Sequence, residues 1–263
     1  MDARKGEISV RYLRGIYVIW LREVIRFRRE PARLIGMVAQ PLLYLLLVGN
    51  GIAHGFSLRA GGHVNYLGFM FPGIVAMSVL FTSMFSAMSI VWDREFGFLK
   101  EVLVSPVPRA SIALGKAFGG GTIALLQGAI LLLLAPLVGL KLGMGIYFEL
   151  LAILALLSLA LNGLGILVAI RLSTMQGFQV VMNFLVMPLF FLSGALYPLR
   201  GMPSWLSDLM KIDPLTYGVD AMRHVVGNSV VQFSLSTDIW IVVLVTVGLV
   251  SVATWQFSSA PAS

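Results

Sequence analysis

The chain alternates long uncharged apolar runs with short segments that hold most of its charges. With histidine counted as neutral, six runs reach the roughly 20 residues that a membrane-spanning helix needs. They are Leu34–Leu58, Val64–Trp92, Ala117–Leu140, Leu150–Ile170, Leu172–Leu199 and Ile239 to the C-terminus. The pattern predicts an all-α membrane protein with six transmembrane helices. Pro72, Pro136 and Pro188 should kink or interrupt their helices.

Composition supports a membrane location. The chain is 58% hydrophobic and only 12% charged, with a mean hydropathy of +0.91, whereas a soluble domain carries about 25% charged residues. The absence of cysteine excludes a disulfide framework, a thiolate metal site and a catalytic thiol. The net charge of +7 does not indicate nucleic-acid binding, because nine of the nineteen basic residues precede the first apolar run.

Residues 1–33 form a basic amphipathic segment. One row at helical spacing is apolar, and a second row, offset by two positions, is basic. The apolar row is Leu13, Tyr17, Trp20, Val24 and Phe27, and the basic row is Arg22, Arg26, Arg29 and Arg33. We expect a cytoplasmic interfacial helix that lies on an anionic membrane surface. A nucleic-acid arm and a signal peptide are the alternatives, and the length and charge of the segment disfavour the second.

The distribution of basic residues predicts the orientation. A cytoplasmic N-terminus places residues 1–33, the loop Asp93–Lys116 and the turn at Arg171 inside, with fourteen basic residues against five outside. This arrangement obeys the positive-inside rule, and the opposite one violates it. We therefore expect two cytoplasmic termini, a six-span domain over residues 34–257 and a short cytoplasmic tail over residues 258–263.

The loop over residues 93–109 carries a short amphipathic pattern. Phe96, Leu99 and Leu103 follow helical spacing. Gly97 separates this helix from the preceding span, and Pro106 ends it. The apolar side could dock on another protein or rest on lipid headgroups, and the spacing alone leaves both readings open.

The outer region, residues 193–226, does not fit a simple span followed by a loop. Gly194 and Pro198 interrupt its apolar start, and two short helical patterns follow. Asp213 and Pro214 have the pattern of an N-cap and a first-turn proline, with Leu215, Val219 and Met222 on one face. These pieces are too short to cross a bilayer, so we expect re-entrant or interfacial half-helices, or else a lid on the outer headgroups.

Polar residues within the spans have two interpretations. They could line a translocation path, but amides in a membrane bundle more often form hydrogen bonds between helices. They are Gln40, Asn50, Gln127, Asn162, Gln179 and Asn183. Two glycine pairs match the GxxxG pattern, and one of them continues into a run of three glycines, which permits close helix contact. The pairs are Gly115 with Gly119 and Gly139 with Gly143, and the run is Gly119, Gly120 and Gly121. No Asp, Glu or Lys stands isolated in mid-span, which argues against an ion-coupled secondary carrier.

The sequence shows no catalytic motif. His54, His63 and His224 lack metal-binding spacing, which argues against a membrane enzyme. The segment ALGKA around Lys116 lacks the glycine and the Ser or Thr of a phosphate-binding loop, so the chain cannot bind ATP by that device. We expect a chain that is not an enzyme and has no cofactor or metal of its own.

Three segments resemble the membrane subunit of type-2 ABC exporters, especially the permeases of daunorubicin-resistance-like drug exporters. They are WLREVIRFRREP, DREFGFLKEVLVSPVPRASIALGK, and PLFFLSGALYPLRGMPSWL with DPLTYGVDAMR. The resemblance implies a homodimeric permease in a bacterial plasma membrane, coupled to two copies of a separate ATPase subunit that bind ATP and Mg. The cargo would be a hydrophobic or amphipathic drug, lipid or glycan.

The resemblance also implies roles for individual residues. The segment that couples to the ATPase would contain Arg94, Glu95, Phe96, Gly97, Leu99, Lys100, Glu101 and Leu103. The interfacial helix would contribute Trp20, Arg22, Glu23, Arg26 and Arg29 near the same interface. The outer re-entrant region would depend on Gly194, Tyr197, Pro198, Pro214 and Tyr217.

Overall fold

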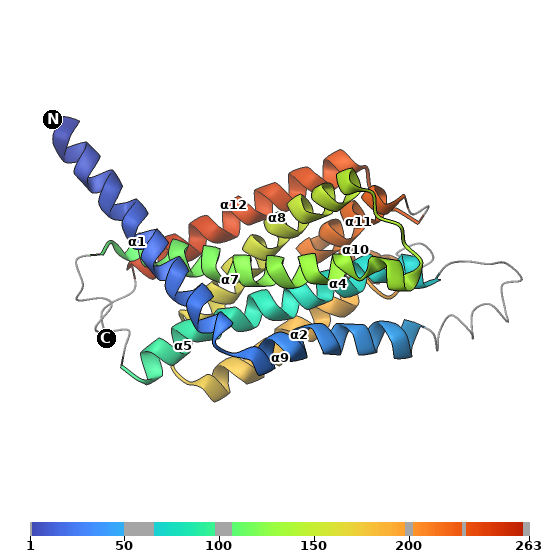
Figure 1. Ribbon diagram of the computed structural model, residues 1–263, viewed down its shortest axis with the longest axis horizontal. Helices are drawn as coiled ribbons and strands as arrows, with labels where there is room; N and C mark the ends of the chain where they lie inside the picture. Colours follow the sequence, from blue (N-terminus) through green and yellow to red (C-terminus); the bar gives the residue numbers. More distant parts are fainter. Residues whose placement is uncertain (1, 50–65, 98–106, 198–201, 228–229, 260–263) are drawn as a thin grey trace, which may run out of the picture.

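The computed structural model describes residues 2–49, 66–97, 107–197, 202–227 and 230–259, and every regular element in these ranges is helical (Figure 1). The elements are α1 (Asp2–Arg28), α2 (Pro31–Tyr44), the π-helix η1 (Leu45–Gly49), α4 (Tyr66–Ser86), α5 (Met88–Glu95), α7 (Arg109–Leu133), the 3-10 helix η2 (Ala135–Val138), α8 (Met144–Ala169), α9 (Met175–Leu192), α10 (Ser204–Ile212), α11 (Pro214–Val226) and α12 (Leu235–Ser259).

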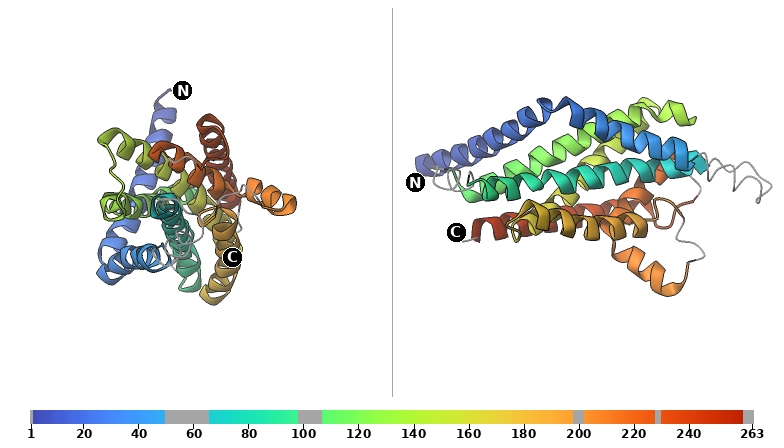
Figure 2. Two further views of the ribbon diagram at one scale, coloured as in Figure 1. Left: turned by 90° about the vertical axis from the view of Figure 1, so that its right-hand side faces the viewer. Right: turned by 90° about the horizontal axis from the view of Figure 1, so that it is seen from below.

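The long helices run roughly along one axis and form an elongated bundle (Figures 1 and 2). The start of α1 and the end of α12 lie at the end of the bundle where α5 ends and α7 begins, which we call the loop end. The short helices α10 and α11 lie at the opposite end, the far end. Figure 2 shows α10 projecting away from the bundle.

Five helical segments in the described residues are long and apolar enough to cross a membrane. They are α4 with α5, α7, α8, α9 and α12. The first predicted span, Leu34–Leu58, forms α2 and η1, with a shorter apolar helix over Ile35–Leu47, and its last part lies outside the described residues. The all-helical class is confirmed, and the count of six spans stays a prediction.

Several predicted boundaries are wrong where a charged residue lies inside a helix. α8 begins at Met144 rather than Leu150 and includes Glu149, and α5 ends at Glu95 rather than Trp92. α7 begins at Arg109 rather than Ala117, so Lys116 belongs to the helix and not to the loop. α12 begins at Leu235 rather than Ile239 and includes Asp238. A search for uncharged runs stops at every charge, and it misses a charged residue that the fold buries.

The three prolines affect their helices differently. α7 ends at Leu133, and Pro136 lies in η2, so the predicted interruption of this run is confirmed. Pro72 and Pro188 lie inside α4 and α9, which continue through them. Neighbouring helices can tolerate the missing backbone hydrogen bond at these positions.

The core is built around α4. In its most apolar window 78% of α4–α5 is buried, against 22% for α9 and 17% for α12, so α4 is central and α9 and α12 are peripheral. Fully buried core residues include Met70, Leu80, Ile112, Leu154, Phe178 and Met222. The peripheral helices leave large apolar faces for lipid or protein to cover.

The start of α11 follows its predicted cap. The Asp213 carboxylate accepts a hydrogen bond from the backbone nitrogen of Leu215 at 2.9 Å, and Pro214 occupies the first turn. Leu215, Val219 and Met222 are all buried, as the spacing predicts. Burial raises the pKa of Asp213 to about 7, although the hydrogen bond from Leu215 opposes this shift.

Candidate functional site at the loop end

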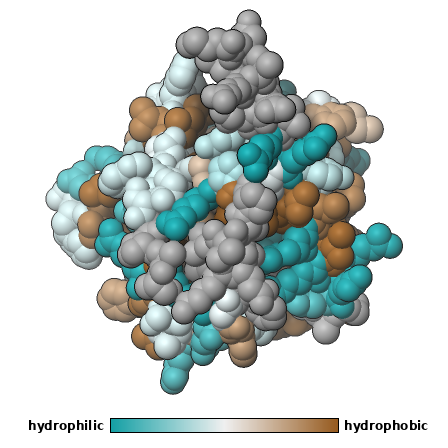
Figure 3. All heavy atoms as spheres, turned by 90° about the vertical axis from the view of Figure 1, so that its left-hand side faces the viewer, coloured by the Kyte–Doolittle hydropathy of each residue, from teal (hydrophilic) through white to brown (hydrophobic). Residues whose placement is uncertain are grey.

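Four parts of the chain meet at the loop end: α1, the end of α5, the first half of α7, and the turn between α8 and α9. Viewed from this side, hydrophilic residues are interspersed with apolar ones (Figure 3). The predicted coupling residues that the structure describes, Arg94 to Gly97, belong to this end. Residues 98–106 of the loop lie outside the described residues, and the chain on both sides of them is held by the contacts of this end.

α1 crosses α7 at two glycines. A Cβ atom at Gly115 would lie 2.6 Å from the Cβ of Ile19, and one at Gly119 would lie 2.8 Å from the Cβ of Glu23. Only glycine allows the two backbones to approach this closely. The GxxxG prediction of a close helix contact is confirmed at Gly115 and Gly119, and the partner is the N-terminal helix. It is wrong at Gly139 and Gly143, where no described atom lies within 4 Å of an added Cβ. Trp20 adds a hydrogen bond from its indole nitrogen to α7 at 3.0 Å.

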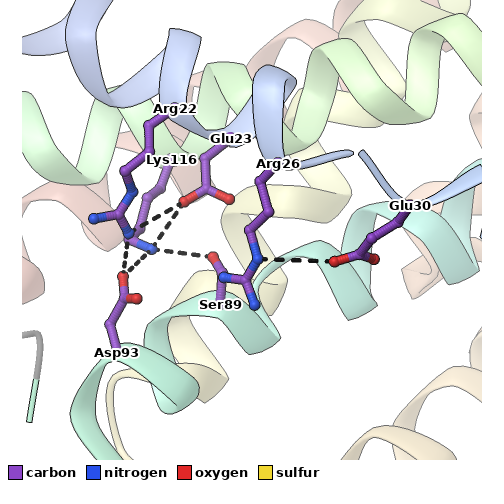
Figure 4. A network of polar contacts seen from close by, with 7 residues as sticks. All are labelled: Arg22, Glu23, Arg26, Glu30, Ser89, Asp93 and Lys116. Atoms are coloured by element: carbon purple, nitrogen blue, oxygen red, sulfur yellow. Dashed lines mark hydrogen bonds and ion pairs between the residues drawn. The ribbon is translucent and has the colours of Figure 1, made fainter. Parts of the chain in front are cut away.

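Four charged residues, which we call the loop-base cluster, join α1, α5 and α7: Arg22, Glu23, Asp93 and Lys116 (Figure 4). Lys116 Nζ lies 2.7 Å from Asp93 Oδ2 and 3.2 Å from Glu23 Oε1. Arg22 Nη2 donates to the same Asp93 oxygen at 2.7 Å. Lys116 also donates to Ser89 Oγ at 3.0 Å. Two cations face two anions, so the formal charges balance.

The inner three members are well buried. The side chains of Lys116, Glu23 and Asp93 are 3%, 7% and 9% exposed, whereas Arg22 is 39% exposed. Removing one partner of a buried pair leaves an uncompensated charge, at a cost of about 3–5 kcal/mol. The cluster therefore holds the three helices together only while it is complete.

Asp93, Arg94 and Glu95 are consecutive, yet each contacts a different element. Asp93 binds α1 and α7 through the cluster. Arg94 Nη1 donates to two backbone carbonyls of the α8–α9 turn at 2.8 and 2.9 Å. Glu95 accepts from the backbone nitrogen of Met175 at 2.9 Å, where the unpaired N–H groups at the start of α9 favour a negative charge. Three residues thus connect the start of the loop to most of the loop end.

The arginine row of α1 turns partly toward α5. The Arg26 guanidinium lies 4.7 Å from the centre of the Trp92 ring, and its Nε is 4.0 Å from Glu30. Arg22 joins the loop-base cluster, whereas Arg29 is exposed. The residues that pack α1 on α7 include Ile19 and Glu23, which lie between the predicted apolar and basic rows.

The predicted coupling residues divide at residue 97. Phe96 is exposed, and Gly97 adopts a φ of +80°, which favours glycine and turns the chain directly after α5. The span thus ends just before Gly97, and the short helix expected after this glycine lies outside the described residues. Leu99, Lys100, Glu101 and Leu103 lie outside the described residues, so their docking role stays a prediction.

A groove of about 360 Å³ lies between α2, α4 and α7. Its lining is mostly apolar and aromatic and includes Tyr44 and Phe81, with Gln40 as an exposed amide and no charged side chain among the described residues. Gln127 fixes its floor, because it donates to the Met37 carbonyl at 2.6 Å and accepts from Thr82. The groove therefore suits an uncharged, amphipathic molecule.

The intramembrane amides divide between the two interpretations. Gln127 and Asn162 form hydrogen bonds between helices, and the Asn162 amide donates to the Ser83 carbonyl at 3.0 Å. Gln40, Gln179 and Asn183 are instead exposed on the subunit. These three remain candidates for a pathway or a subunit interface, and Asn50 lies outside the described residues.

The outer region is tied down by an arginine that the sequence analysis did not single out. Arg223 is 2% exposed, donates to the Gly194 and Ala195 carbonyls at 2.8 and 3.1 Å, and lies 3.8 Å from the centre of the Phe69 ring. A signal was available, because Arg223 continues the buried row of Leu215 at a spacing of two helical turns.

The predicted outer residues have structural contacts. Gly194 has a φ of +68° at a turn. The Tyr197 hydroxyl donates to the Phe191 carbonyl at 2.5 Å, and the Tyr217 hydroxyl donates to the Lys211 carbonyl at 2.7 Å. Pro198 lies outside the described residues. The short helices exist, whereas their re-entrant placement in a membrane stays a prediction.

The pattern of charges did not reveal Asp93 and Lys116 as a buried pair. Both were expected in a cytoplasmic loop because they carry charge. The available signal was the neighbourhood of Lys116, which has Ala113, Gly119 and Gly120 at helical spacing. A lysine among such small residues lies on the face where two helices approach closely.

Several apolar helices long enough to span a bilayer, with charged networks at their ends, define an integral multi-pass membrane protein. The sequence profile of the ABC-2 type transporter family matches residues 14–227, which is most of the chain. The protein belongs to the ABC-2 type transporter family and is a transport permease.

Named relatives agree with this assignment. The chain is similar to the transport permease ycf38 of Cyanophora paradoxa, with 33% identity over 86% of this chain and 78% of the relative. It is 28% identical to nodulation protein J of Rhizobium leguminosarum bv. trifolii, over 81% and 82% of the two chains. It is also 28% identical to the inner membrane transport permease YadH of Escherichia coli K12, over 78% and 80%.

Proposed function

We propose that this permease is the membrane subunit of an ATP-driven exporter, works as a homodimer, and is moved by two copies of a separate ATPase that bind ATP and Mg. The observation that carries the proposal is the triplet Asp93, Arg94 and Glu95, which anchors the start of the loop to α1, α7, the α8–α9 turn and α9. A loop anchored in this way delivers force to several helices at once.

The proposed mechanism begins at the loop. Closure of the ATPase pair pushes on the loop of each permease, and the anchors pass this displacement to α1, α7 and α9. A bundle with two stable packings then changes state and opens a route between the two permeases. The excess of basic residues near the loop end supports a cytoplasmic location for this end and for both termini.

The two peripheral helices support a specific dimer face. α9 exposes a polar row within an apolar helix, formed by Gln176, Gln179 and Asn183. The exposed large residues of α12 are apolar and include Trp240 and Trp255 near its ends. Tryptophan favours the membrane–water interface, whereas amides favour protein or water over lipid. We therefore assign α12 to lipid and α9 to the subunit interface and pathway.

The groove between α2, α4 and α7 supports a cargo class. Its apolar walls and uncharged polar groups suit a hydrophobic or amphipathic compound, such as a drug, a lipid or a glycan carried on a lipid. Outward transport and a place in the daunorubicin-resistance-like branch rest on the resemblance of the three sequence segments. The groove itself, which no charged residue lines among the described residues, favours binding of an uncharged part of the cargo.

The test separates ATPase binding from coupling. Arg94→Ala removes the anchor to the α8–α9 turn but leaves residues 98–106 of the loop unchanged. The permease should therefore still copurify with its ATPase, while transport falls at least tenfold in vesicles supplied with ATP. Arg171→Ala, an exposed arginine in the same turn, is the matched control and should transport normally.

A third variant addresses the loop surface. Glu101→Lys should abolish both copurification and transport while the chain stays in the membrane. Full transport by Arg94→Ala would contradict the anchoring role. Uptake that follows an ion gradient without ATP, by a chain that purifies alone, would overturn the ATP-driven function.

A further inference from the structure

At the far end, α11 and the first turn of α12 bring together Asp220, His224 and Asp238. The possible metal-ligating atoms of these three side chains, one from each, all lie within 4.8 Å of one another. Nothing in the transport mechanism above uses this group. The cluster is remote from the loop-base cluster, because α11 and the start of α12 lie at the opposite end of the bundle (Figure 1).

Asp238 has a buried carboxylate that lacks hydrogen-bond partners among the described residues. Its residue exposure is 0%, and neither carboxylate oxygen has a hydrogen-bond partner among the described residues. The closest approach of a possible cation is His224 Nδ1 at 3.6 Å, which is too long for a hydrogen bond and leaves that nitrogen unpartnered too. A buried charged group without partners is costly, so the two side chains present an unmet polar site that a cation between them would satisfy.

The other nearby charges do not supply it. Asp220 is a second negative group, whose carboxylate accepts hydrogen bonds from the backbone nitrogens of Gln232 and Phe233 at 2.9–3.1 Å. Arg223 directs its guanidinium to backbone carbonyls and the Phe69 ring. Two carboxylates and an imidazole thus face one another with no fixed cation among them in the described part of the chain.

We propose that Asp238, His224 and Asp220 bind a divalent transition-metal ion of the zinc class. Imidazole nitrogen with carboxylate oxygen is a ligand set for such ions, and three protein ligands leave a position for water. Bonds of about 2.0–2.2 Å place neighbouring ligand atoms roughly 3–3.5 Å apart. Atoms already within 4.8 Å reach that spacing by small side-chain rotations.

The chemistry of each ligand fits a distinct role. Asp238 lies in the first turn of α12, so its carboxylate stands near the unpaired backbone N–H groups of the helix start and on the side of the cluster that faces α11. His224 is 24% exposed, which gives an ion a way in. Asp220 already holds the backbone that leads to α12 and has a free lone pair for the metal. The ion would join α11 to α12 and fix the far end of the bundle.

The test uses the full chain, purified in detergent with an affinity tag that contains no histidine and stripped of metal by a chelator. Zinc chloride is then titrated, and the bound zinc per subunit and the unfolding temperature are measured. We expect one zinc per subunit and a saturable rise in the unfolding temperature. Magnesium at the same concentrations should have no such effect, because it disfavours imidazole.

Three variants assign the binding. His224→Ala and Asp238→Asn should lose both the bound zinc and the rise in unfolding temperature. His54→Ala/His63→Ala, which removes the other two histidines, should keep both. Without metal, Asp238→Asn should be at least as stable as the native chain, because it removes a buried carboxylate that has no partner.

Two results would overturn the proposal. The first is zinc bound equally by the native chain and by His224→Ala. The second is a native chain with no rise in unfolding temperature at any zinc concentration, which would mean that a proton on Asp238 satisfies the cluster instead. His224→Ala keeps the test decisive even if Asp238→Asn does not fold.

Discussion

Lys116 has three oxygen acceptors on two neighbouring helices, at 2.7, 3.0 and 3.2 Å. Its ammonium group therefore replaces the water it loses on burial with three hydrogen bonds. Asp93 receives two cations, Lys116 and Arg22, at the same oxygen. At the scale of single residues, this shared oxygen links α1 to the helices on both sides of the loop.

Lys116→Met should lower the free energy of unfolding by roughly 3–5 kcal/mol, because it keeps the side-chain volume but leaves Asp93 and Glu23 without their buried cation. Denaturant unfolding of the purified chain in detergent measures the change. Lys116→Arg keeps the charge and should cost much less. The double variant Lys116→Met/Asp93→Asn should lose less than the sum of the two single variants. A native-like Lys116→Met would show that the cluster contributes no stability.

At the scale of elements, the close contact between α1 and α7 depends on glycine. Gly115 has the Cβ and a backbone oxygen of α1 residues within 2.9 Å of where its own Cβ would lie. Gly248 of α12 has nothing within 4 Å of the same point. The two positions therefore allow the same substitution to be compared with and without a helix partner.

Gly115→Ala should destabilise the chain by about 1–3 kcal/mol, because the added methyl group forces α1 away from α7. Gly248→Ala should be neutral or stabilise it by roughly 0.5–1 kcal/mol, because alanine favours a helix and has free space there. Thermal unfolding of the two variants and the native chain, side by side in one detergent, checks both. Equal effects would mean that α1 does not press on α7.

Much of the helical framework could be predicted from the pattern of charges and caps. The apolar runs mark the long helices because lipid excludes charges, and Asp213 with Pro214 marks the start of α11 because this pair satisfies local backbone needs. The start of α7 could not be found in this way. Its lysine is neutralised by Asp93 and Glu23, which are distant in sequence, and a count along the chain does not reveal tertiary partners.

The face of α1 illustrates a second limit. The apolar and basic rows were predictable, but the contact with α7 lies between them, along Ile19 and Glu23. A helix packs closely where its partner offers small residues, and that information belongs to α7 rather than to α1. Leu13 and Tyr17, members of the apolar row, are exposed on the subunit instead.

At the scale of the whole molecule, two helices of similar apolar character differ in what their exposed faces carry. The exposed side chains of α9 include amides beside apolar residues such as Phe184, whereas those of α12 include two tryptophans near its ends. The proposed dimer rests on this contrast, because it places α9 against a second copy and α12 against lipid. The groove beside α2 lies within the same bundle, so a dimer through α9 would enclose a route between two subunits.

Single-cysteine variants test this arrangement directly, because the chain has no native cysteine. Cysteine placed at Gln176, Gln179 or Asn183 of α9 should form disulfide-linked dimers on oxidation in native membranes. Cysteine at Leu244 or Val247 of α12, exposed and apolar, is the control and should remain monomeric. Gel mobility without reductant measures the outcome. Dimers from α12 and none from α9 would reverse the assignment.

The anchors of the loop that the described residues provide lie on both sides of residues 98–106: Asp93, Arg94 and Glu95 come before this segment, and Lys116 comes after it. The sequence of residues 98–106, which we propose contacts the ATPase, can therefore change without loss of these anchoring contacts. Related permeases could keep the same membrane bundle and exchange only this short segment when they bind a different ATPase. Replacing residues 98–106 with those of another family member should change which ATPase the permease binds. The membrane bundle and the transported compound should remain those of the original permease.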